Sequence, residues 1–472
     1  MRSPESVILL TKRLLATFCM LAVVRGVASA APQHAAAGPA ADRARPNVVL
    51  IISDDQRWTD YGFMGHDTIR TPNLDRLARE GARFDRGYVP TSLCRPSLAT
   101  ILTGLYPHEH KTVGNDPARP PGMARNSPEY AALCDRLIAH IDRVPSVAKL
   151  LAGAGYASFQ SGKWWEGHYR RGGFTDGMTH GDRRRGGRHG DEGLKIGRQG
   201  MQPIFDFIQR CGGQPFFLWY APFLPHQPHN PPPRLLHKYE AAGRPQELAR
   251  YFAMCQWFDE TCGQLLDYLD QQSLSDKTLV VYLADNGWIQ RTPATLVPKD
   301  WRFPFAPKSK RSPYDGGTRT PIILRWPGAI KPARYDALAS SVDLAPTILR
   351  ACGLEPPRCM SGINLLEACA GQPIARAAVF GEVFSHDVAA LDRPEASLLF
   401  RWAIEGRWKL ILPYAAAGAR RDADGKAERP QPQLFDLQAD PHETRNLAAR
   451  QPDIVDRLRQ RIDAWYQPQP ST

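Results

Sequence analysis

The chain has 472 residues, enough for one large α/β domain with a smaller one, or for two or three ordinary domains. Its formal net charge of +12 at pH 7 favours anionic partners such as acidic polysaccharide. The densest basic run, DRRRGGRHGDEG at 182–193, has neighbouring acids and no interleaved aromatic residues. We therefore expect a solvated loop there and no nucleic-acid partner.

The amino terminus predicts export. Residues 1–30 combine a basic start, the apolar run LLATFCMLAVV and the sequence Ala28-Ser29-Ala30, as in a secretory signal peptide. They hold four basic residues and one acidic residue, so cleavage would lower the formal charge to +9. Residues 31–45 are rich in Ala, Pro and Gly and predict a flexible leader. No later segment is long and apolar enough for a membrane span, so we expect a periplasmic or secreted protein.

Eight of the nine cysteines follow the predicted signal peptide, and an exported protein permits disulfides. The first pairs to consider are Cys352 with Cys359, or Cys359 with Cys369. Cys255 and Cys262 lie about two turns apart on one predicted helix, too far for a bridge within it.

Continuous apolar runs alternate with amphipathic helical patterns from residue 47 onward. The run NVVLIIS at 47–53 is typical of a strand buried on both faces of a parallel sheet. Similar runs lie at 156–162, 215–223, 278–285 and 320–326, and the helical patterns between them include TPNLDRLAREG, VPSVAKLLAGAG and AMCQWFDETCGQLLDYLDQQ. This alternation predicts an α/β fold with a large, mostly parallel sheet flanked by helices.

After about residue 375 the apolar runs become shorter, as in LLFRWAIEGRWKLILPY and QPQLFDLQADPHETRNL. These patterns predict a short antiparallel sheet and a terminal helix. We therefore expect a catalytic domain at 46–375 and a C-terminal subdomain at 376–472.

Acidic side chains follow two of the predicted strands. Asp54 and Asp55 end the first strand, and Asp285 and Asn286 end the run at 278–285. Ligands of open α/β sheets bind beyond the carboxyl ends of the strands, where these groups would repel one another without a cation. Oxygen ligands without nearby His or Cys favour Ca²⁺, with Mg²⁺ possible. The alternative is that each pair caps the following helix.

The other strand ends carry cations and proton donors, namely Lys163, His226, His229 and Lys310. Singly, each of these residues is more often a solvated surface group. Together, around a cation, they are suited to binding an anionic ester and neutralising charge on its leaving oxygen.

Cys94, in TSLCRPSLATILTG, is the candidate nucleophile. Pro96 fits the first turn of the helix that follows, so Cys94 lies near a helix N-terminus that favours an anion and would activate a thiolate. Soft sulfur matches a hard-oxygen metal centre poorly, and an oxygen nucleophile would fit better. The alternative is a half-buried thiol that packs under the helix.

The chain resembles the type I, formylglycine-dependent sulfatase family of the alkaline-phosphatase-like superfamily, from Pro46 to about Leu447. The resemblance rests on seven motifs in the family's order: RPNVVLIISDDQR, CRPSLATILTGLYP, GKW, PHQPH, LADNG, KRSPYDGGTRTPIILRWPG and LFDLQADPHETRNLA. It implies an alkaline-phosphatase-like fold for 46–375.

The resemblance also implies roles for the site residues. In this family the cysteine is oxidised before folding to formylglycine, whose hydrate is an oxygen nucleophile. It implies catalytic roles for Cys94, Lys163, His226 and Lys310, calcium binding by Asp54, Asp55, Asp285 and Asn286, and substrate contacts for His229, with His108 and Arg95 as further candidates.

The chain departs from the family at two positions. The modification signature is C-x-P-x-R, and its last position here is Leu98, while Arg95 is adjacent to the cysteine. The family's G-K-W-H has Trp165 in its last position. His168 is a candidate replacement for the missing histidine, and Trp165 a candidate for lining a sugar subsite.

These observations predict an exported sulfatase that acts on a sulfated sugar or polysaccharide and meets a formylglycine-generating or equivalent maturing enzyme during biogenesis. A phosphoester or phosphonate hydrolase on the same fold is one alternative. A non-catalytic sulfated-glycan binder is another.

Overall fold

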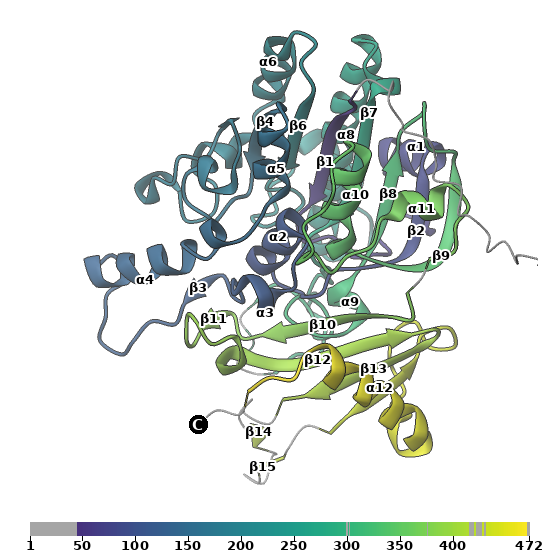
Figure 1. Ribbon diagram of the computed structural model, residues 1–472. Coiled ribbons are helices and arrows are strands. Elements are labelled where there is room, and N and C mark those ends of the chain that lie inside the picture. Colours follow the sequence, from purple (N-terminus) through teal and green to yellow (C-terminus); the bar gives the residue numbers. More distant parts are fainter. Residues whose placement is uncertain are drawn as a thin grey trace, which may run out of the picture. The chain divides into compact units, whose positions relative to one another are not determined.

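A computed structural model describes residues 45–298, 301, 303–374, 376–414, 420–421, 427–428 and 431–469, which belong to one compact unit (Figure 1). The predicted signal peptide, 1–30, and the leader up to residue 44 lie outside the described residues. In the described part of the chain, no helix has the length and apolar character needed to cross a bilayer.

The larger of the two main sheets has eight strands in the order β5-β4-β6-β1-β7-β8-β2-β9. Its strands are β1 (Asn47–Ser53), β2 (Ala82–Tyr88), β4 (Ala157–Gly162), β5 (Asp176–Gly177), β6 (Phe216–Ala221), β7 (Thr278–Ala284), β8 (Arg319–Arg325) and β9 (Ala333–Ser340). Every pairing is parallel except those of β8, which runs antiparallel to β7 and to β2. The predicted mostly parallel α/β fold is therefore confirmed.

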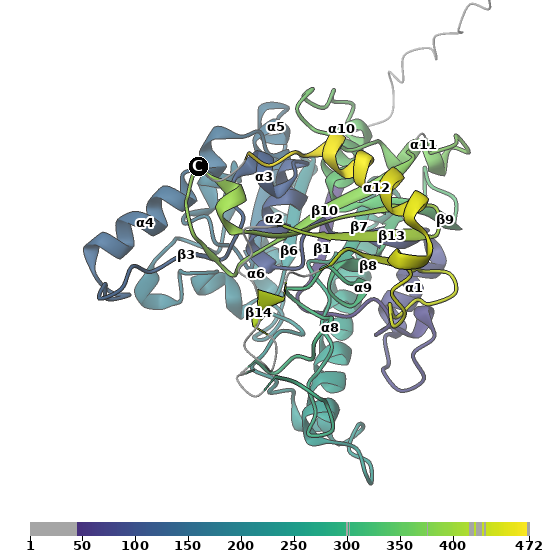
Figure 2. The same cartoon turned by 90° about the horizontal axis from the view of Figure 1, so that it is seen from below.

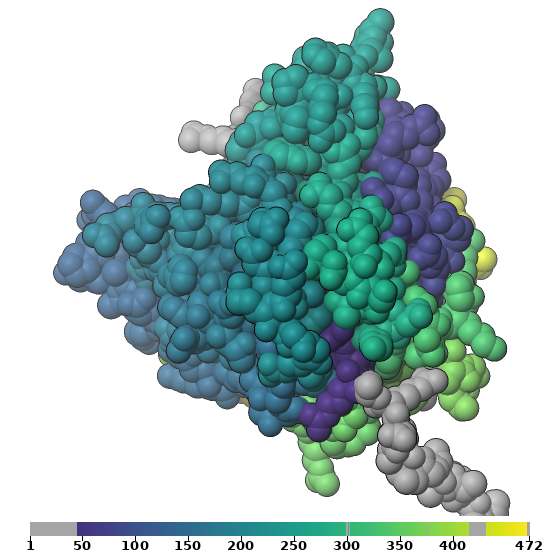
Figure 3. Space-filling view, turned by 90° about the horizontal axis from the view of Figure 1, so that it is seen from above, coloured from purple at the N-terminus to yellow at the C-terminus, as the bar shows by residue number. Residues whose placement is uncertain are grey.

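The helices of the described chain are α1 (Pro72–Glu80), α2 (Cys94–Thr103), α3 (Pro107–His110), α4 (Pro128–Ile138), α5 (Val147–Gly153), α6 (Gln202–Cys211), α7 (Pro233–Leu236), α8 (Gln246–Gln271), α9 (Asp315–Thr318), α10 (Leu344–Ala351), α11 (Leu365–Cys369) and α12 (Pro452–Trp465). On the face shown in Figure 3, the purple segment with α1 and the blue segment with α4 lie on opposite sides of the teal segment with α8.

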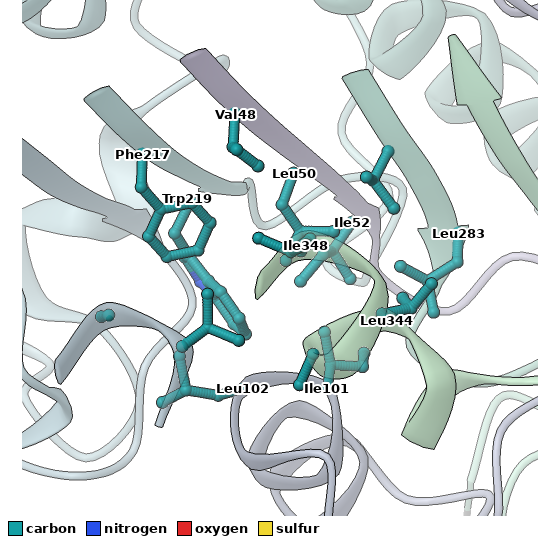
Figure 4. Close-up of a cluster of buried hydrophobic side chains, with 14 of the residues drawn as sticks. Val48, Leu50, Ile52, Ile101, Leu102, Phe217, Trp219, Leu283, Leu344 and Ile348 are labelled. Atoms are coloured by element: carbon teal, nitrogen blue, oxygen red, sulfur yellow. The ribbon is translucent and has the colours of Figure 1, made fainter. Parts of the chain in front are cut away.

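The core lies on both faces of the large sheet, which explains the continuous apolar run of β1. Val48, Leu50 and Ile52 pack with side chains of α2, α5 and α10, as Figure 4 shows for α2 and α10. Val49 and Ile51 point to the other face and pack with α1, α6 and α8. Each such side chain contributes about 1.5–3 kcal/mol to folding when it leaves water. Burial on both faces holds the carboxyl end of β1 in a fixed position.

The second sheet is antiparallel, in the order β10-β12-β13-β16, with strands β10 (Ala378–Phe384), β12 (Leu398–Glu405), β13 (Trp408–Pro413) and β16 (Gln433–Asp436). Leu458 and Ile462 of α12 pack on Leu410 and Leu434. The predicted short antiparallel sheet with a terminal helix is confirmed. Figure 2 shows it across one end of the molecule, with α12 on its outer side. Two short pairs complete the strands: β3 (Asp116–Pro117) with β11 (Asp387–Val388), and β14 (Arg420–Arg421) with β15 (Ala427–Glu428).

A buried charge cluster joins the two sheets. Lys409 Nζ of β13 lies 2.8 Å from Asp315 Oδ1 of α9 and 3.0 Å from Glu443 Oε1. The backbone N–H of Asp315 donates to Glu443 Oε2 at 2.6 Å. All three side chains are almost fully buried. Removing one partner from such a group costs about 3–5 kcal/mol, so this cluster fixes the second sheet to the segment before β8.

All eight cysteines of the described residues are free, so neither predicted disulfide is present. Burial raises the pKa of the Cys352 thiol, which interacts with the Tyr156 side chain, to about 11. Burial likewise raises the pKa of Cys369, beside Tyr335, to about 11. Cys359 is exposed. Those predictions were wrong because spacing does not show which way each thiol points.

Candidate active site

The acidic pairs predicted at two strand ends meet in the structure, because β1 and β7 are adjacent and parallel. The backbone N–H of Asp55 donates to Asp285 Oδ1 at 3.1 Å, and Asn286 Nδ2 donates to Asp55 Oδ1 at 2.7 Å. Asp55 has a φ of 66°, a left-handed conformation that is uncommon for a non-glycine residue. All four side chains, including Asp54, are buried.

These side chains fit a cation. Four buried oxygens accept no well-aligned hydrogen bond within the described residues: Asp54 Oδ2, Asp55 Oδ2, Asp285 Oδ2 and Asn286 Oδ1. Ion-pair contacts reach two of them, from Lys163 Nζ to Asp54 at 2.6 Å and from His226 Nε2 to Asp55 at 3.4 Å. Buried oxygens without donors are costly unless something positive satisfies them. A hard divalent cation with oxygen ligands would do so.

Cys94 lies beside this acidic group, as the first residue of α2, and is 1% exposed. Its Sγ is 3.2 Å from Lys163 Nζ, 2.9 Å from Lys310 Nζ, 3.7 Å from Asp54 Oδ1 and 3.8 Å from Asp55 Oδ1. Side chain 94 therefore sits between two ammonium groups and two carboxylates. Any group carried there faces cations on one side and the candidate metal ligands on the other.

The two lysines are held by the carboxylates that they neutralise. Lys163 Nζ donates to Asp54 Oδ1, and Lys310 Nζ donates to Asp55 Oδ1, each at 2.6 Å. Burial alone would lower both lysine pKa values, but the carboxylates outweigh it and raise them. Both therefore stay charged. Gly162, with φ at 87°, places Lys163, since a Cβ at Gly162 would lie 1.9 Å from the carbonyl oxygen of Ala221.

Burial raises the pKa of the Cys94 thiol well above its ordinary value, although Lys163 and Lys310 act in the opposite direction. The expected activation as a thiolate is thus not present in the unmodified residue. The position at a helix N-terminus was expected to lower the thiol pKa. Burial outweighs that effect, and the nearby Asp285 and Asp55 carboxylates also raise the pKa.

Two predicted histidines lie at the carboxyl end of β6. His226 directs Nε2 toward Asp55 and Nδ1 toward the carbonyl oxygen of Gln227, 2.6 Å away. Burial lowers its pKa well below the ordinary value, so the ring is neutral. His229 packs near Tyr251 and Trp288, and burial lowers its pKa to about 4. His226 lines the pocket over Cys94, whereas His229 is outside the lining and contacts one lining residue, Trp288.

The pocket over Cys94 is built largely from loops. Besides Asp55, Lys163, His226 and Lys310, its walls include Asn115, Trp165, Arg188, His189, Gln227, Trp288, Phe303, Phe305, Arg311 and His386. Arg188 and His189 belong to the run 182–193, so the prediction of a merely solvated loop was wrong. Arg184 does project into solvent, 92% exposed, but the loop folds back and pairs Arg188 with Asp116. A basic sequence pattern could not show which arginine turns inward.

The two remaining predicted substrate contacts, Arg95 and His108, lie outside the pocket lining. Arg95 donates to both carboxylate oxygens of Glu166, at 2.8 and 2.7 Å, and is 3% exposed. His108 Nδ1 lies 3.0 Å from Glu382 Oε1, and its ring stacks on Tyr466. Both side chains are thus occupied by internal partners, and their role as substrate contacts stays a prediction.

The structure also shows what surrounds the two positions at which the chain departs from the family's motifs. Leu98 packs in the core cluster that contains β1 and α2, so the side chain at this position lies in apolar surroundings. Trp165 does line the pocket. His168 caps the short turn at Tyr169–Gly172 and lies outside the lining. His189, which sequence reasoning missed, lies 5.5 Å from Trp165 between ring centres and does enter the lining.

We compared the chain with known protein families and with individual relatives. The sequence pattern of the sulfatase family matches residues 46–354, and that of the N-sulphoglucosamine sulphohydrolase C-terminal region matches residues 308–467. The N-acetylgalactosamine-6-sulfatase of Sus scrofa is 31% identical over 365 residues, which are 68% of this chain and 66% of that protein.

Solved structures share the fold. One, of a protein in complex with its substrate D-glucosamine-2-N,6-O-disulfate, has a TM-score of 0.67 at 22% identity and covers 89% of this chain and 97% of its own. The phosphonate monoester hydrolase of Agrobacterium radiobacter has a TM-score of 0.64 at 20% identity, covering 89% and 95%. At these identities the likeness is one of fold alone. Together with the matched sequence pattern, it leads to one conclusion: the chain belongs to the sulfatase family, a family of sulfuric ester hydrolases.

Proposed function

We propose that the protein hydrolyses sulfate esters of sulfated sugars, with formylglycine in place of Cys94 and a divalent cation on the strand-end oxygens. One observation carries the proposal: side chain 94 lies between Lys163 Nζ and Lys310 Nζ, at 3.2 and 2.9 Å, beside a cluster of buried oxygens without donors. The sulfated-sugar substrates named for the relatives support the choice of substrate class.

Asp54, Asp55, Asp285 and Asn286 would hold the cation, for which calcium is the first candidate and magnesium the second. When bound, it supplies positive charge against a sulfate oxygen and lowers the pKa of an oxygen nucleophile. Formylglycine supplies a hydrated aldehyde, whose hydroxyl oxygen suits a hard-oxygen site better than sulfur does.

The chain's own residues perform the remaining work. Lys163 and Lys310 bind the non-bridging sulfate oxygens and stay charged there, which stabilises negative charge that develops during S–O cleavage. His226 stands at the pocket wall and would pass a proton to the departing sugar oxygen, after its neutral ring has first taken that proton up at Nε2 from the attacking hydroxyl or water. The net reaction consumes one water, breaks the S–O ester bond and releases the sugar alcohol and sulfate.

We also propose that the protein is exported to the periplasm or beyond, after loss of residues 1–30, and that a sulfatase-maturing enzyme converts Cys94. The apolar amino terminus supports the first point. Sequencing the amino terminus of protein from the native host tests it, and a mature protein that begins at Met1 would contradict it.

Mass spectrometry of the peptide containing residue 94, from protein made in the native host, tests the nucleophile. We expect an aldehyde or its hydrate, and a complete loss of sulfate ester turnover in Cys94→Ala. A thiol in every molecule would contradict the formylglycine mechanism. Turnover of matched sulfate, phosphate and phosphonate esters separates the proposal from the alternative on the same fold, since a phosphate or phosphonate hydrolase would prefer the phosphorus esters. Binding of sulfated sugar without any turnover would favour the glycan-binding alternative.

A further inference from the structure

The cationic side chains of the pocket differ in whether a carboxylate pairs with them. Lys163 and Lys310 pair with Asp54 and Asp55, and Arg188 forms two hydrogen bonds to Asp116. Arg311 forms no hydrogen bond or ion pair through its guanidinium within the described residues. Its guanidinium packs over the Phe303 ring, whose centre lies 4.7 Å from the guanidinium carbon.

The backbone aims this unpaired guanidinium into the pocket. Arg311 follows Lys310 directly and has a φ of 65°, a left-handed conformation that costs a non-glycine residue about 1 kcal/mol or more. Its N–H donates to the carbonyl oxygen of Ser92 at 2.8 Å. The side chain is half-buried and lines the same pocket as Cys94 and Lys310. The loop is thereby tied to the segment that leads into α2.

Burial lowers the pKa of Arg311, and the carboxylate that opposes this effect, Asp387, is already bonded to His386 Nδ1 at 2.6 Å. A half-buried guanidinium without a carboxylate of its own is incompletely solvated and has free donors in a planar array. That array matches a planar carboxylate or a sulfate. Lys163 and Lys310 are the cations next to side chain 94, so Arg311 is free to take a different anionic group.

We infer that Arg311 is a specificity-determining residue that binds a second anionic group of the substrate, a carboxylate or a further sulfate, while the first sulfate is held over residue 94. This inference rests on the proposed function. It defines the substrate as a sugar, or a short oligosaccharide, that carries at least two negative groups. The face of the Phe303 ring lies against the guanidinium and restricts its orientation for that contact.

Kinetics with three substrates test the inference: N-acetylgalactosamine 6-sulfate with one negative group, D-glucosamine-2-N,6-O-disulfate with two sulfates, and a disaccharide of an uronic acid with the 6-sulfated sugar. We expect wild-type kcat/KM to be at least about tenfold higher for one of the doubly charged substrates. Arg311→Gln should remove that preference, mainly through KM, and change the singly charged substrate less than about threefold. Arg311→Lys should keep part of the preference.

Arg184→Gln is the matched control, since Arg184 is 92% exposed, and it should behave as wild type. The doubly charged substrate whose kcat/KM falls most in Arg311→Gln shows whether Arg311 binds a second sulfate or a carboxylate. Equal loss on all three substrates, or no loss, overturns the inference. If wild type cleaves none of them, the proposed function fails. Calorimetric binding of the disulfated sugar to wild type and Arg311→Gln then still decides the role of Arg311, and equal affinities overturn it.

Discussion

Arg95 and Glu166 form a buried ion pair with two parallel hydrogen bonds, and Arg95 directly follows Cys94 in the chain. Arg95 Nη1 also donates to the carbonyl oxygen of Asn115. The arginine next to the reactive position therefore joins the start of α2 to the loop after β4. Its charge is already neutralised by Glu166, so its contacts in this structure hold the start of α2 in place.

We predict that Glu166→Gln lowers the free energy of unfolding by about 3–5 kcal/mol, because it leaves a buried guanidinium without its counter-charge. The double variant Arg95→Met/Glu166→Leu should recover most of this loss, as it removes both charges together. Urea unfolding measures both effects. Asp142→Asn, which breaks the more exposed Arg171–Asp142 pair, should cost less than about 1 kcal/mol. Equal stability of Glu166→Gln and wild type would contradict the assignment.

Asp285→Asn should weaken calcium binding by more than about tenfold. Asp285 Oδ1 accepts two backbone N–H groups, whereas Oδ2 has no donor among the described residues. The amide keeps the first oxygen and puts an N–H₂ group where the candidate ligand was. Titration calorimetry with CaCl₂ on chelator-treated protein is the measurement. Asp67→Asn, at a side chain 94% exposed, is the control, and unchanged affinity in Asp285→Asn would place the cation elsewhere.

His189→Gln should lower kcat/KM for a sulfate ester by about tenfold or more, while His168→Gln leaves it unchanged. Burial lowers the pKa of His189 to about 3, so its ring is neutral in the pocket, and Nδ1 has no hydrogen-bond partner among the described residues. His168 is closer to Trp165 in sequence, only three positions away, but lies outside the pocket lining. Circular dichroism melts check that both variants fold. A larger loss in His168→Gln would reverse the assignment.

The His108–Glu382 pair predicts a pH-dependent contribution to stability. Burial alone would lower the pKa of His108, but the Glu382 carboxylate outweighs it and raises the pKa above 6.5. A raised folded-state pKa means that the contribution is fully present below the unfolded value and is lost as pH rises through the folded value. Wild type should therefore exceed His108→Gln in unfolding free energy by about 1.5–3 kcal/mol at pH 5.5 and by less at pH 9.

Guanidinium unfolding of both proteins at several pH values gives this difference directly. His237→Gln is the control, because His237 is 73% exposed and pairs with a half-exposed glutamate. A wild-type advantage that grows with pH would mean that His108 is held neutral in the folded protein.

The site residues that could be grouped from the sequence are those that directly follow buried strands. Asp54, Asp285 and Lys163 follow apolar runs whose parallel pairing puts their ends at one edge of the sheet, so strand patterns suffice to group them. β2 was missed because Arg83, Asp85 and Arg86 interrupt its apolar pattern, although Ala82 and Phe84 are fully buried. The antiparallel direction of β8 also has no signature in its run TPIILRW.

The pocket wall was less predictable because its residues come from loops without periodicity. Arg188, His189 and Arg311 reach the pocket through backbone turns, including left-handed residues, that depend on distant partners. His386 joins from the loop between β10 and β11, more than 290 positions after Cys94. Contacts of this kind are set by the finished tertiary structure, and local sequence carries no record of them.

The buried Lys409 cluster has a consequence for the order of events during synthesis. The pocket over Cys94 is complete only when Lys310 and His386 are in place, and the second sheet is fixed through Glu443. About 350 residues separate Cys94 from Glu443, which at roughly 5–20 residues per second is a delay of about 20–70 seconds on the ribosome. If Cys94 is converted before folding, as proposed above, the maturing enzyme has only this interval in which to act on an accessible residue 94.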